Sequence, residues 1–311
     1  MMTNDNLLQG IIEDLIHDFL YRFFPADFPN FDLTQPILFL DKELTQIMPE
    51  SENGHRRIDK LIQLALKTGE KEHILVHSEM QGYRHENYEK REFIYYYRLY
   101  DRFSLPIATL AIFTDSDPDY EPNCYKIELM GTKLTYEFPT YKVLKMDPEA
   151  LAASENLFDV VLLTVYWAIK AKRKEVTEED LLDLKTDLIR RLLERNIDKT
   201  RIRKLLLFIK AYIRFEKEEI SLKFERNYEE LLKIKGPMGV EEILIMQAEE
   251  RGISIGEKRG EERGISIGEE RGEERGIKKE RTQAEKEKFE YRKSVILKMR
   301  SEGFSIEKSP I

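Results

Sequence analysis

The feature that most constrains the fold is a pair of short apolar segments joined by a polar turn. The first reads HRRIDKLIQLALKTG, and the second, at 74 to 82, reads ILVHSEMQG. Each has the length of a strand, and the residues Thr68, Gly69 and Glu70 between them are typical of a turn. The pattern predicts a β-hairpin. If the hairpin turns about Gly69, the numbers of paired residues add up to twice 69, or 138.

A hairpin in this register places two acids directly opposite each other. Asp59 is the expected partner of Glu79, and Gln81 shares a face with Glu79 because alternate side chains of a strand point the same way. Opposed residues have Cβ atoms about 5 Å apart, so two carboxylates repel unless a cation lies between them. The spacing therefore predicts a metal site. A register slip of one residue would send the two acids to opposite faces.

The same strand carries two histidines that we expect to lie apart from any metal. His73 and His77 have the four-residue spacing of a helical zinc pair, but four residues of a strand span about 13 Å. Ordinary surface or edge histidines are therefore expected at both positions.

Helix and strand patterns alternate around the hairpin. Apolar residues at helical spacing from 5 to 24 predict one long amphipathic helix that ends at Pro25. The segment PILFLDKELTQ predicts a short strand or loop that carries Asp41 and Glu43. Downstream, the runs PIATLAIFTD, CYKIELMG and TKLTYEFPTYKVLKM predict further strands. This order indicates an α/β fold for the first part of the chain.

A second helix is expected directly after the hairpin. In NYEKREFIYYYRLYDRF, four aromatic residues recur with the period of a helix, namely Phe93, Tyr96, Tyr97 and Tyr100. We expect this aromatic stripe to face the sheet.

The pattern divides the chain into three parts. Residues 1–147 are expected to form the α/β domain, 148–240 an α-helical region whose Trp167 belongs to its core, and 241–311 a charged tail. The tail contains a twelve-residue repeat, EERGISIGEKRG followed by EERGISIGEERG, with glycine at every fourth position. Each glycine costs a helix about 1 kcal/mol relative to alanine, so a marginal, solvated helix is expected there.

Composition limits the class of protein. The 311 residues carry a net charge of −8 and a single cysteine, which argues against a generally basic DNA-coating protein and against a disulfide framework. The sequence shows neither a run of eighteen apolar residues nor a signal-peptide pattern. We expect a cytoplasmic protein without a membrane partner. A local basic groove for nucleic acid is compatible with the net charge.

Three segments together resemble a known family. They read RRIDKLIQLALKTG, ILVHSEMQG and REFIYYYRLYDRFSLPIATLAIFTD. They are similar to the recombination-promoting nuclease (Rpn) family of putative transposases, a branch of the PD-(D/E)XK nuclease superfamily. The resemblance covers residues 5–147. It implies a mixed central sheet flanked by helices, and Mg²⁺-dependent hydrolysis of DNA by a metal-activated water, with Mn²⁺ as an alternative ion.

The resemblance also implies a catalytic set. Asp59 matches the motif aspartate, Glu79 matches the acid of the E-x-K element, and Gln81 stands at the lysine position. The two carboxylates and the backbone carbonyl of Met80 would hold the metal. Gln81 can orient a water molecule by hydrogen bonding, but it does not bring the positive charge of a lysine.

Two further pairs of residues enter through the resemblance. Arg91 and Tyr95, on the helix after the hairpin, are implied as contacts to DNA phosphates. Gln9 and Gly10, on the first helix, stand where relatives often show a Lys-Glu pair. A helix-borne acidic ligand at that position is therefore in doubt.

The expected function is that of a Mg²⁺-dependent DNA endonuclease of the recombination-promoting nuclease type. Two alternatives stay open: an inactive nuclease-like module that binds DNA or protein, and a protein whose repeat tail mediates assembly. A homo-oligomer is compatible with all three. Metal-dependent nicking of DNA separates the first function from the other two.

Overall fold

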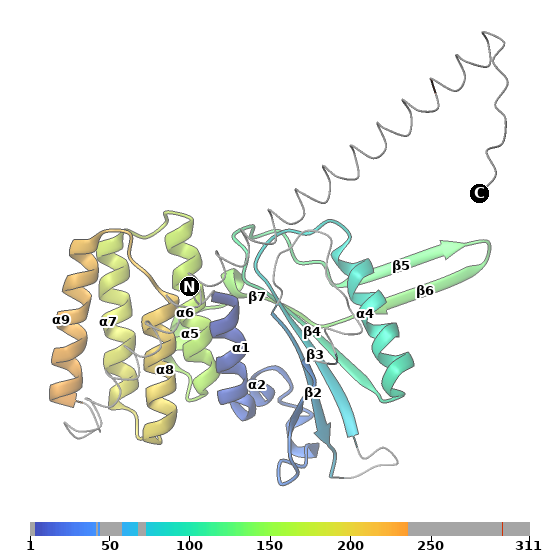
Figure 1. The fold of residues 1–311 in the computed structure, drawn as a ribbon, viewed down its shortest axis with the longest axis horizontal. Coiled ribbons are helices and arrows are strands. Elements are labelled where there is room, and N and C mark those ends of the chain that lie inside the picture. The colour runs from blue at the N-terminus through green and yellow to red at the C-terminus, as the bar shows by residue number, and fades with distance from the viewer. Residues whose placement is uncertain (1–3, 42, 44–57, 68–72, 236–293, 295–311) are drawn as a thin grey trace, which may run out of the picture. The chain divides into compact units, whose positions relative to one another are not determined.

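The computed structural model describes residues 4–41, 43, 58–67, 73–235 and 294 (Figure 1). The predicted turn about Gly69 and the repeats at 249–280 lie outside the described residues, as does the tail at 241–311 apart from Ser294. All the helices and strands below belong to one compact unit within residues 2–248.

A mixed five-stranded sheet forms the centre of the first half of the chain, with the strand order β1-β2-β3-β4-β7. The strands are β1 (Leu38–Phe39), β2 (Ile58–Ala65), β3 (His73–Gln81), β4 (Ile107–Phe113) and β7 (Thr140–Lys142). Strands β1, β2 and β3 pair antiparallel, whereas β3, β4 and β7 pair parallel. The prediction of an α/β fold with a mixed sheet flanked by helices is confirmed.

The register of the β2–β3 hairpin is the one that the sequence predicts. Asp59 is the Cα partner of Glu79, and every other pair in the ladder also adds up to 138. The alternation of β3 is confirmed as well. Val76 and Met80 point into the main hydrophobic core, and Glu79 and Gln81 point to the other face, beneath α4 (Tyr88–Phe103).

The first helical segment is two helices rather than one. It divides into α1 (Asn4–Asp14) and α2 (Ile16–Phe23), because Leu15 between them leaves helical geometry at φ −119° and ψ 32°. Leu15 is nevertheless buried, and its backbone N–H and C=O keep hydrogen bonds to Ile11 and Phe19. The apolar spacing runs through the bend unchanged, so the sequence pattern contains no sign of it.

The aromatic stripe of α4 does not face the five-stranded sheet, and this prediction is wrong. Tyr97 and Tyr100 are 49% and 53% exposed. Phe93 and Tyr96 instead contact a separate two-stranded hairpin formed by β5 (Cys124–Leu129) and β6 (Thr132–Glu137). The side of α4 that is buried carries Tyr88, Arg91, Glu92, Tyr95 and Leu99.

Within the described residues, five α-helices follow β7, as the helical periodicity predicts. They are α5 (Pro148–Ala153), α6 (Leu157–Lys172), α7 (Glu178–Glu194), α8 (Lys199–Tyr212) and α9 (Glu218–Lys235). Side chains accept hydrogen bonds from the first backbone N–H groups of four of them, through Asp147, Asn156, Thr177 and Asp198. Two short 3₁₀ helices, η1 (Phe28–Asn30) and η2 (Val143–Lys145), flank the sheet strands in sequence.

The helical region and the sheet share one hydrophobic core. Phe19 and Phe23 of α2 pack edge-on against Phe158 of α6, with ring centroids 5.1 and 5.9 Å away. Beside them, Arg22 Nε donates to Asp159 Oδ1 at 2.5 Å. The same cluster of buried residues continues from the sheet through α6, α7, α8 and α9, and Trp167 packs against it. No helix in the described part of the chain is long and apolar enough to cross a membrane.

One lysine is buried among these helices. Lys185 of α7 donates to the carbonyl oxygens of Lys210 at 3.0 Å and Ile213 at 2.7 Å, and its Nζ lies 3.8 Å from the centre of the Phe224 ring. Burial lowers the pKa of Lys185 to about 7; the nearby Lys210 also lowers it, and Glu225 opposes the change. Lys185 therefore joins the end of α8 to α7 and α9.

Candidate functional site

The candidate site lies at the carboxyl end of β3, beneath α4. Strand alternation directs the side chains of Glu79 and Gln81 toward the helix, and both residues are at most 1% exposed. The sequence forms a strand here because Ile74, Leu75 and Val76 anchor it in the two cores on either side of the sheet. Rigid apolar packing therefore fixes where the two polar residues stand.

Arg91 of α4 holds both of these side chains. Its Nη2 forms an ion pair with Glu79 Oε1 and donates a hydrogen bond to Gln81 Oε1 at 3.2 Å. The Gln81 amide is fixed from its other side as well, since its Nε2 donates to the backbone oxygen of Tyr83 at 2.5 Å. Gln81 is thus held in one orientation with its carbonyl oxygen toward the arginine.

Two tyrosine rings flank the same arginine. The guanidinium carbon lies 4.7 Å from the ring centre of Tyr88 and 5.8 Å from that of Tyr95. Burial acts to lower the pKa of Arg91, but the negative charges of Glu79 and Glu92 outweigh this effect and raise it. Arg91 therefore remains a cation. It is 9% exposed and Tyr95 is 7% exposed, so both residues predicted to contact DNA face the interior.

A second acid and a histidine complete the group. Glu92 is fully buried, and its Oε2 lies 3.6 Å from Nδ1 of His77, which is also fully buried. Burial is the main cause that lowers the pKa of His77 to about 4; Glu79 opposes this change, and Arg91 adds to it. The expectation of a surface or edge histidine at position 77 is wrong. We call this group the buried polar cluster; it consists of His77, Glu79, Gln81, Arg91 and Glu92.

The buried polar cluster combines two acids with one permanent cation. Glu79 and Glu92 are the acids, Arg91 is the cation, and the low pKa of His77 keeps its imidazole neutral near pH 7. Asp59 is placed opposite Glu79 by its backbone, but its side chain lies outside what the structure describes. The donor set suits a hard cation, which prefers carboxylate and carbonyl oxygens.

Met80 can offer only its main chain to the site. Its side chain is 3% exposed and belongs to the hydrophobic core on the opposite face of the sheet. Among the described residues, no group of three His, Cys, Asp or Glu side chains is arranged to hold a metal ion. The predicted site does not need such a group, since it consists of two carboxylates and a backbone carbonyl.

Sequence reasoning missed Glu92, although the sequence contains a signal for it. The residues Tyr88, Arg91, Glu92, Tyr95 and Leu99 follow a helical spacing of three and four, with two charged residues inside an otherwise apolar stripe. Charged residues at core positions of a helix indicate pairing with buried partners from another element. Here the partners are on β3.

On the opposite face of β2, a second buried charge faces α1. Lys60 is 2% exposed; its Nζ forms ion pairs with Glu13 of α1 and with Asp41 Oδ2, the latter at 2.5 Å. The backbone N–H of Leu61 donates to the other oxygen of Asp41 at 3.1 Å. The acid of α1 that faces β2 is thus Glu13, one turn after Gly10, and it pairs with Lys60.

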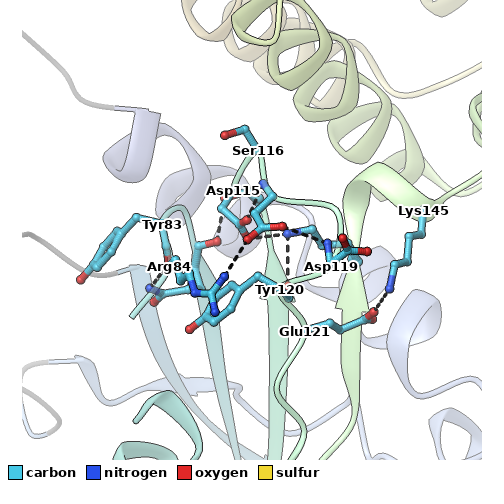
Figure 2. A network of polar contacts seen from close by, with 12 residues as sticks. Tyr83, Arg84, Asp115, Ser116, Asp119, Tyr120, Glu121 and Lys145 are labelled. Atoms are coloured by element: carbon cyan, nitrogen blue, oxygen red, sulfur yellow. Dashed lines mark hydrogen bonds and ion pairs between the residues drawn. The ribbon is translucent and has the colours of Figure 1, made fainter. Parts of the chain in front are cut away.

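A polar network fixes the loops at the carboxyl ends of the parallel strands (Figure 2). Lys142 Nζ lies 2.6 Å from Asp115 Oδ2 and donates to the backbone oxygen of Tyr120 at 3.3 Å. The Tyr120 hydroxyl donates to the backbone oxygen of His85 at 3.0 Å. Arg84, beside Tyr120 in Figure 2, pairs with Asp117 at 3.1 Å. The segments after β3 and β4 and the last residue of β7 are therefore held together next to the candidate site.

Lys142 stands in the same row of the sheet as Gln81. The register pairs Gln81 with Phe113 and Phe113 with Lys142, so the three residues share one face on adjacent strands. The Phe113 ring separates the two polar groups, and Lys142 Nζ lies 5.7 Å from its centre. Phe113 thus forms an apolar wall between the buried polar cluster and the network of Figure 2.

Comparison of the chain with protein families, with curated proteins and with solved structures finds no significant match.

Proposed function

We propose that the chain is a divalent-cation-dependent DNA endonuclease of the recombination-promoting nuclease type, with its site at Asp59 and Glu79. The observation that supports the proposal is the register of β2 and β3, which sets the two acids opposite each other on one face. Gln81 lies on the same face two residues farther along. This is the arrangement that the resemblance to PD-(D/E)XK nucleases leads us to expect.

In this proposal the carboxylates of Asp59 and Glu79 and the backbone carbonyl of Met80 hold Mg²⁺ or Mn²⁺. A bound divalent cation polarises a phosphate and lowers the pKa of a water molecule. Gln81 orients the water or the phosphate through its amide, which Tyr83 and Arg91 already fix in place. The carboxyl groups of the buried polar cluster favour a cation over an anion at this position.

Arg91 is the residue whose role changes most between the sequence and the structure. It is the charge partner of Glu79, so it competes with any cation for that carboxylate. A contact between a DNA phosphate and Arg91 or Tyr95 would require these side chains to turn outward, because both are buried. In the proposal, Arg91 keeps Glu79 ionised and aligned until a cation replaces it.

Plasmid nicking tests the proposal. Purified protein should relax supercoiled plasmid with Mg²⁺ or Mn²⁺ but not with EDTA, and Asp59→Asn and Glu79→Gln should each lower the rate by at least about a hundredfold. Glu229→Gln is the matched control, since it makes the same change at an exposed position on α9. Circular dichroism confirms that each variant is folded. Equal nicking by wild type and both site variants would refute the proposal.

A binding module without catalysis is the second candidate, and the burial of Glu79 favours it. A carboxylate that is fully buried and ion-paired can serve a structural role alone. In that case the protein should bind a labelled duplex with the same affinity in Mg²⁺ and in EDTA, and no variant should alter plasmid topology. Nicking that depends on Asp59 excludes this candidate.

A further inference from the structure

The β5–β6 hairpin is a two-stranded sheet that extends beyond α4, apart from the five-stranded sheet (Figure 1). An isolated two-stranded hairpin is only marginally stable in water, so it needs cover on one face. Phe93 and Tyr96 of α4 supply that cover at the base. The Phe93 ring stacks on the Tyr125 ring with their centroids 5.4 Å apart, and the Tyr96 and Tyr136 ring centroids lie 5.0 Å apart. The distal half has no such cover from α4 aromatics.

The uncovered part of this face is apolar. Strand alternation puts Tyr125, Ile127 and Leu129 of β5 on one side, together with their partners Tyr136, Leu134 and Thr132 of β6. Ile127 is 41% exposed and Leu129 is 63% exposed. Met130, at the tip, is 97% exposed. A run of exposed apolar side chains on a projecting hairpin is typical of a surface that another molecule covers.

The charges of the hairpin favour a protein as that molecule. Its other face carries Lys126 and Lys133 together with Glu128 and Glu137, so its net charge is zero. Phosphate backbones are bound through an excess of positive charge, which this surface lacks. The Lys133 and Glu128 side chains pair at 2.8 Å but are 72% and 68% exposed, so their mutual attraction is weak.

We propose that the hairpin pairs with the hairpin of a second copy of this chain, through the outer edges of their β5 strands. In an antiparallel arrangement centred on Ile127, Lys126 of each copy lies opposite Glu128 of the other. Tyr125 lies opposite Leu129, and Ile127 lies opposite its own counterpart. Every cross-strand pair is then either oppositely charged or apolar, and the contact is two-fold symmetric, as a homodimer requires.

The backbone of β5 is oriented for this pairing. Met130 and Gly131 have positive φ angles of 49° and 84°, as in a two-residue turn of type I′, which makes Leu129 and Thr132 a hydrogen-bonded pair. Hydrogen-bonded and non-hydrogen-bonded pairs alternate, so the N–H groups of Lys126 and Glu128 point away from β6. Among the described residues, β6 is the only strand that pairs with β5. The free edge therefore presents these donors to a partner strand.

The dimer would join two hairpins into one four-stranded sheet. On its apolar face, Leu134 and Ile127 of one copy would continue directly into Ile127 and Leu134 of the other. On the charged face, the row would read Lys133, Glu128 and then Lys126 of the second copy, so that charges alternate in sign. Backbone pairing supplies affinity in such an edge-to-edge contact, and the side-chain pattern supplies the register. This inference does not depend on the proposed nuclease activity.

A matched pair of proline variants tests which edge is used. Lys126 and Thr135 are cross-strand partners at the same height of the hairpin, and their N–H groups point to opposite outer edges. The full-length chain of 37.0 kDa should sediment as a monomer–dimer equilibrium across a concentration series. Lys126→Pro should weaken the dimer by at least about tenfold, and Thr135→Pro should weaken it much less. A wild type that stays monomeric, or equal effects of both variants, would overturn the proposal.

Charge reversal tests the register independently of backbone effects. Positions 126 and 128 of both copies meet at the contact. Lys126→Glu alone would therefore put four glutamates there, and Glu128→Lys alone would put four lysines there. The dissociation constant of each homodimer should rise by about tenfold because of this repulsion. A mixture of the two variants should form a heterodimer, because both cross-strand pairs become oppositely charged again. Failure of the mixture to associate more tightly than either variant alone would contradict this register.

A disulfide locates the two-fold axis. The sequence has one cysteine, Cys124, so Cys124→Ser gives a background without thiols. In that background Ile127→Cys should form an interchain disulfide under mild oxidation, because its counterpart would lie in a non-hydrogen-bonded pair at a Cα separation of about 4.5 Å. Leu134→Cys, its neighbour on β6 and on the same face, is the control and should remain monomeric on a non-reducing gel. Equal cross-linking of both variants would refute the axis at Ile127.

Discussion

Replacing Arg91 with methionine would test whether the buried polar cluster is held together by charge. Methionine keeps much of the volume of the arginine stem but removes the guanidinium that bonds Glu79 and Gln81. Glu79 is fully buried, so it would lose its ion-pair partner without gaining water. We expect the variant to fold with a clearly lower free energy of unfolding.

The size of the loss follows from the contacts. Removing one partner of a buried ion pair costs about 3 to 5 kcal/mol, and the face of Tyr88, 4.7 Å from the guanidinium, adds up to about 1 kcal/mol. Glu79→Gln should cost less, about 2 kcal/mol, because Arg91 still donates its hydrogen bond to Gln81. In addition, Arg91 Nε still lies 3.9 Å from Glu92 Oε1. The double variant should lose about 2 kcal/mol less than the sum of the two single losses.

Urea unfolding at pH 7 measures these values. Arg84→Met is the control, since Arg84 also pairs with an acid and also lies near a tyrosine ring, at 5.6 Å from Tyr120, but its side chain is 73% exposed. This control should lose less than about 1 kcal/mol. A loss below about 1 kcal/mol for Arg91→Met, or strict additivity in the double variant, would refute an electrostatic role for Arg91.

The same variant also probes the cation site. With Arg91 gone, the ion pair that competes for Glu79 is removed, so Mg²⁺ should raise the thermal midpoint of Arg91→Met more than that of the wild type. Glu79→Gln should remove this gain. A midpoint that does not respond to Mg²⁺, Mn²⁺ or Ca²⁺ in Arg91→Met would contradict metal binding at Glu79, whatever the outcome of the cleavage assay.

Three further predictions concern pH and the tail. The pKa of His77 is lowered to about 4 from 6.5, so between these pH values the unfolded chain binds a proton that the folded chain does not. The free energy of unfolding should therefore fall by up to about 1.4 kcal/mol per pH unit as the pH drops from 6.5 to 4. In urea unfolding, His77→Asn should reduce this dependence on pH. The pKa of Lys185 is lowered to about 7 from 10.5, so stability should rise with pH over this interval, and Lys185→Met should abolish the rise. Deleting residues 249–280 should leave both the urea midpoint and plasmid nicking unchanged; loss of nicking by a folded deletion protein would show that the repeats take part.

The hairpin register could be predicted because two independent signals fix it. A two-residue period defines the faces of each strand, and the glycine of the turn defines the pairing, so the sequence alone is enough to match Asp59 with Glu79. The face of α4 could not be predicted in the same way. Its aromatic stripe and its mixed stripe both have helical spacing, and periodicity does not say which stripe meets which partner. The partner of Phe93 is a hairpin that follows more than thirty residues later.

The burial of Arg91 and Glu92 shows a second limit of pattern reading. Charged residues are normally placed at the surface, and they become buried only when their partners compensate the loss of hydration. Whether Glu79 and His77 stand within reach depends on how α4 crosses the sheet, which is a long-range property. Similarly, the interruption at Leu15 leaves the apolar spacing intact, and it is visible only in the backbone angles of that residue.

The ion pairs between the first helices and α8 bear on how the chain folds during synthesis. Lys204 Nζ lies 2.5 Å from Asp14 Oδ1 across 190 residues of sequence, and Arg201 pairs with Asp18 across 183. At about 5 to 20 residues per second, a ribosome needs roughly 10 to 40 seconds to make the chain between these partners. Throughout that interval the surface of α1 that α8 will cover lacks α8 as its partner. Nascent chains should therefore depend on chaperones until α8 emerges, and a premature stop before Lys199 should yield an aggregating product rather than a smaller folded protein.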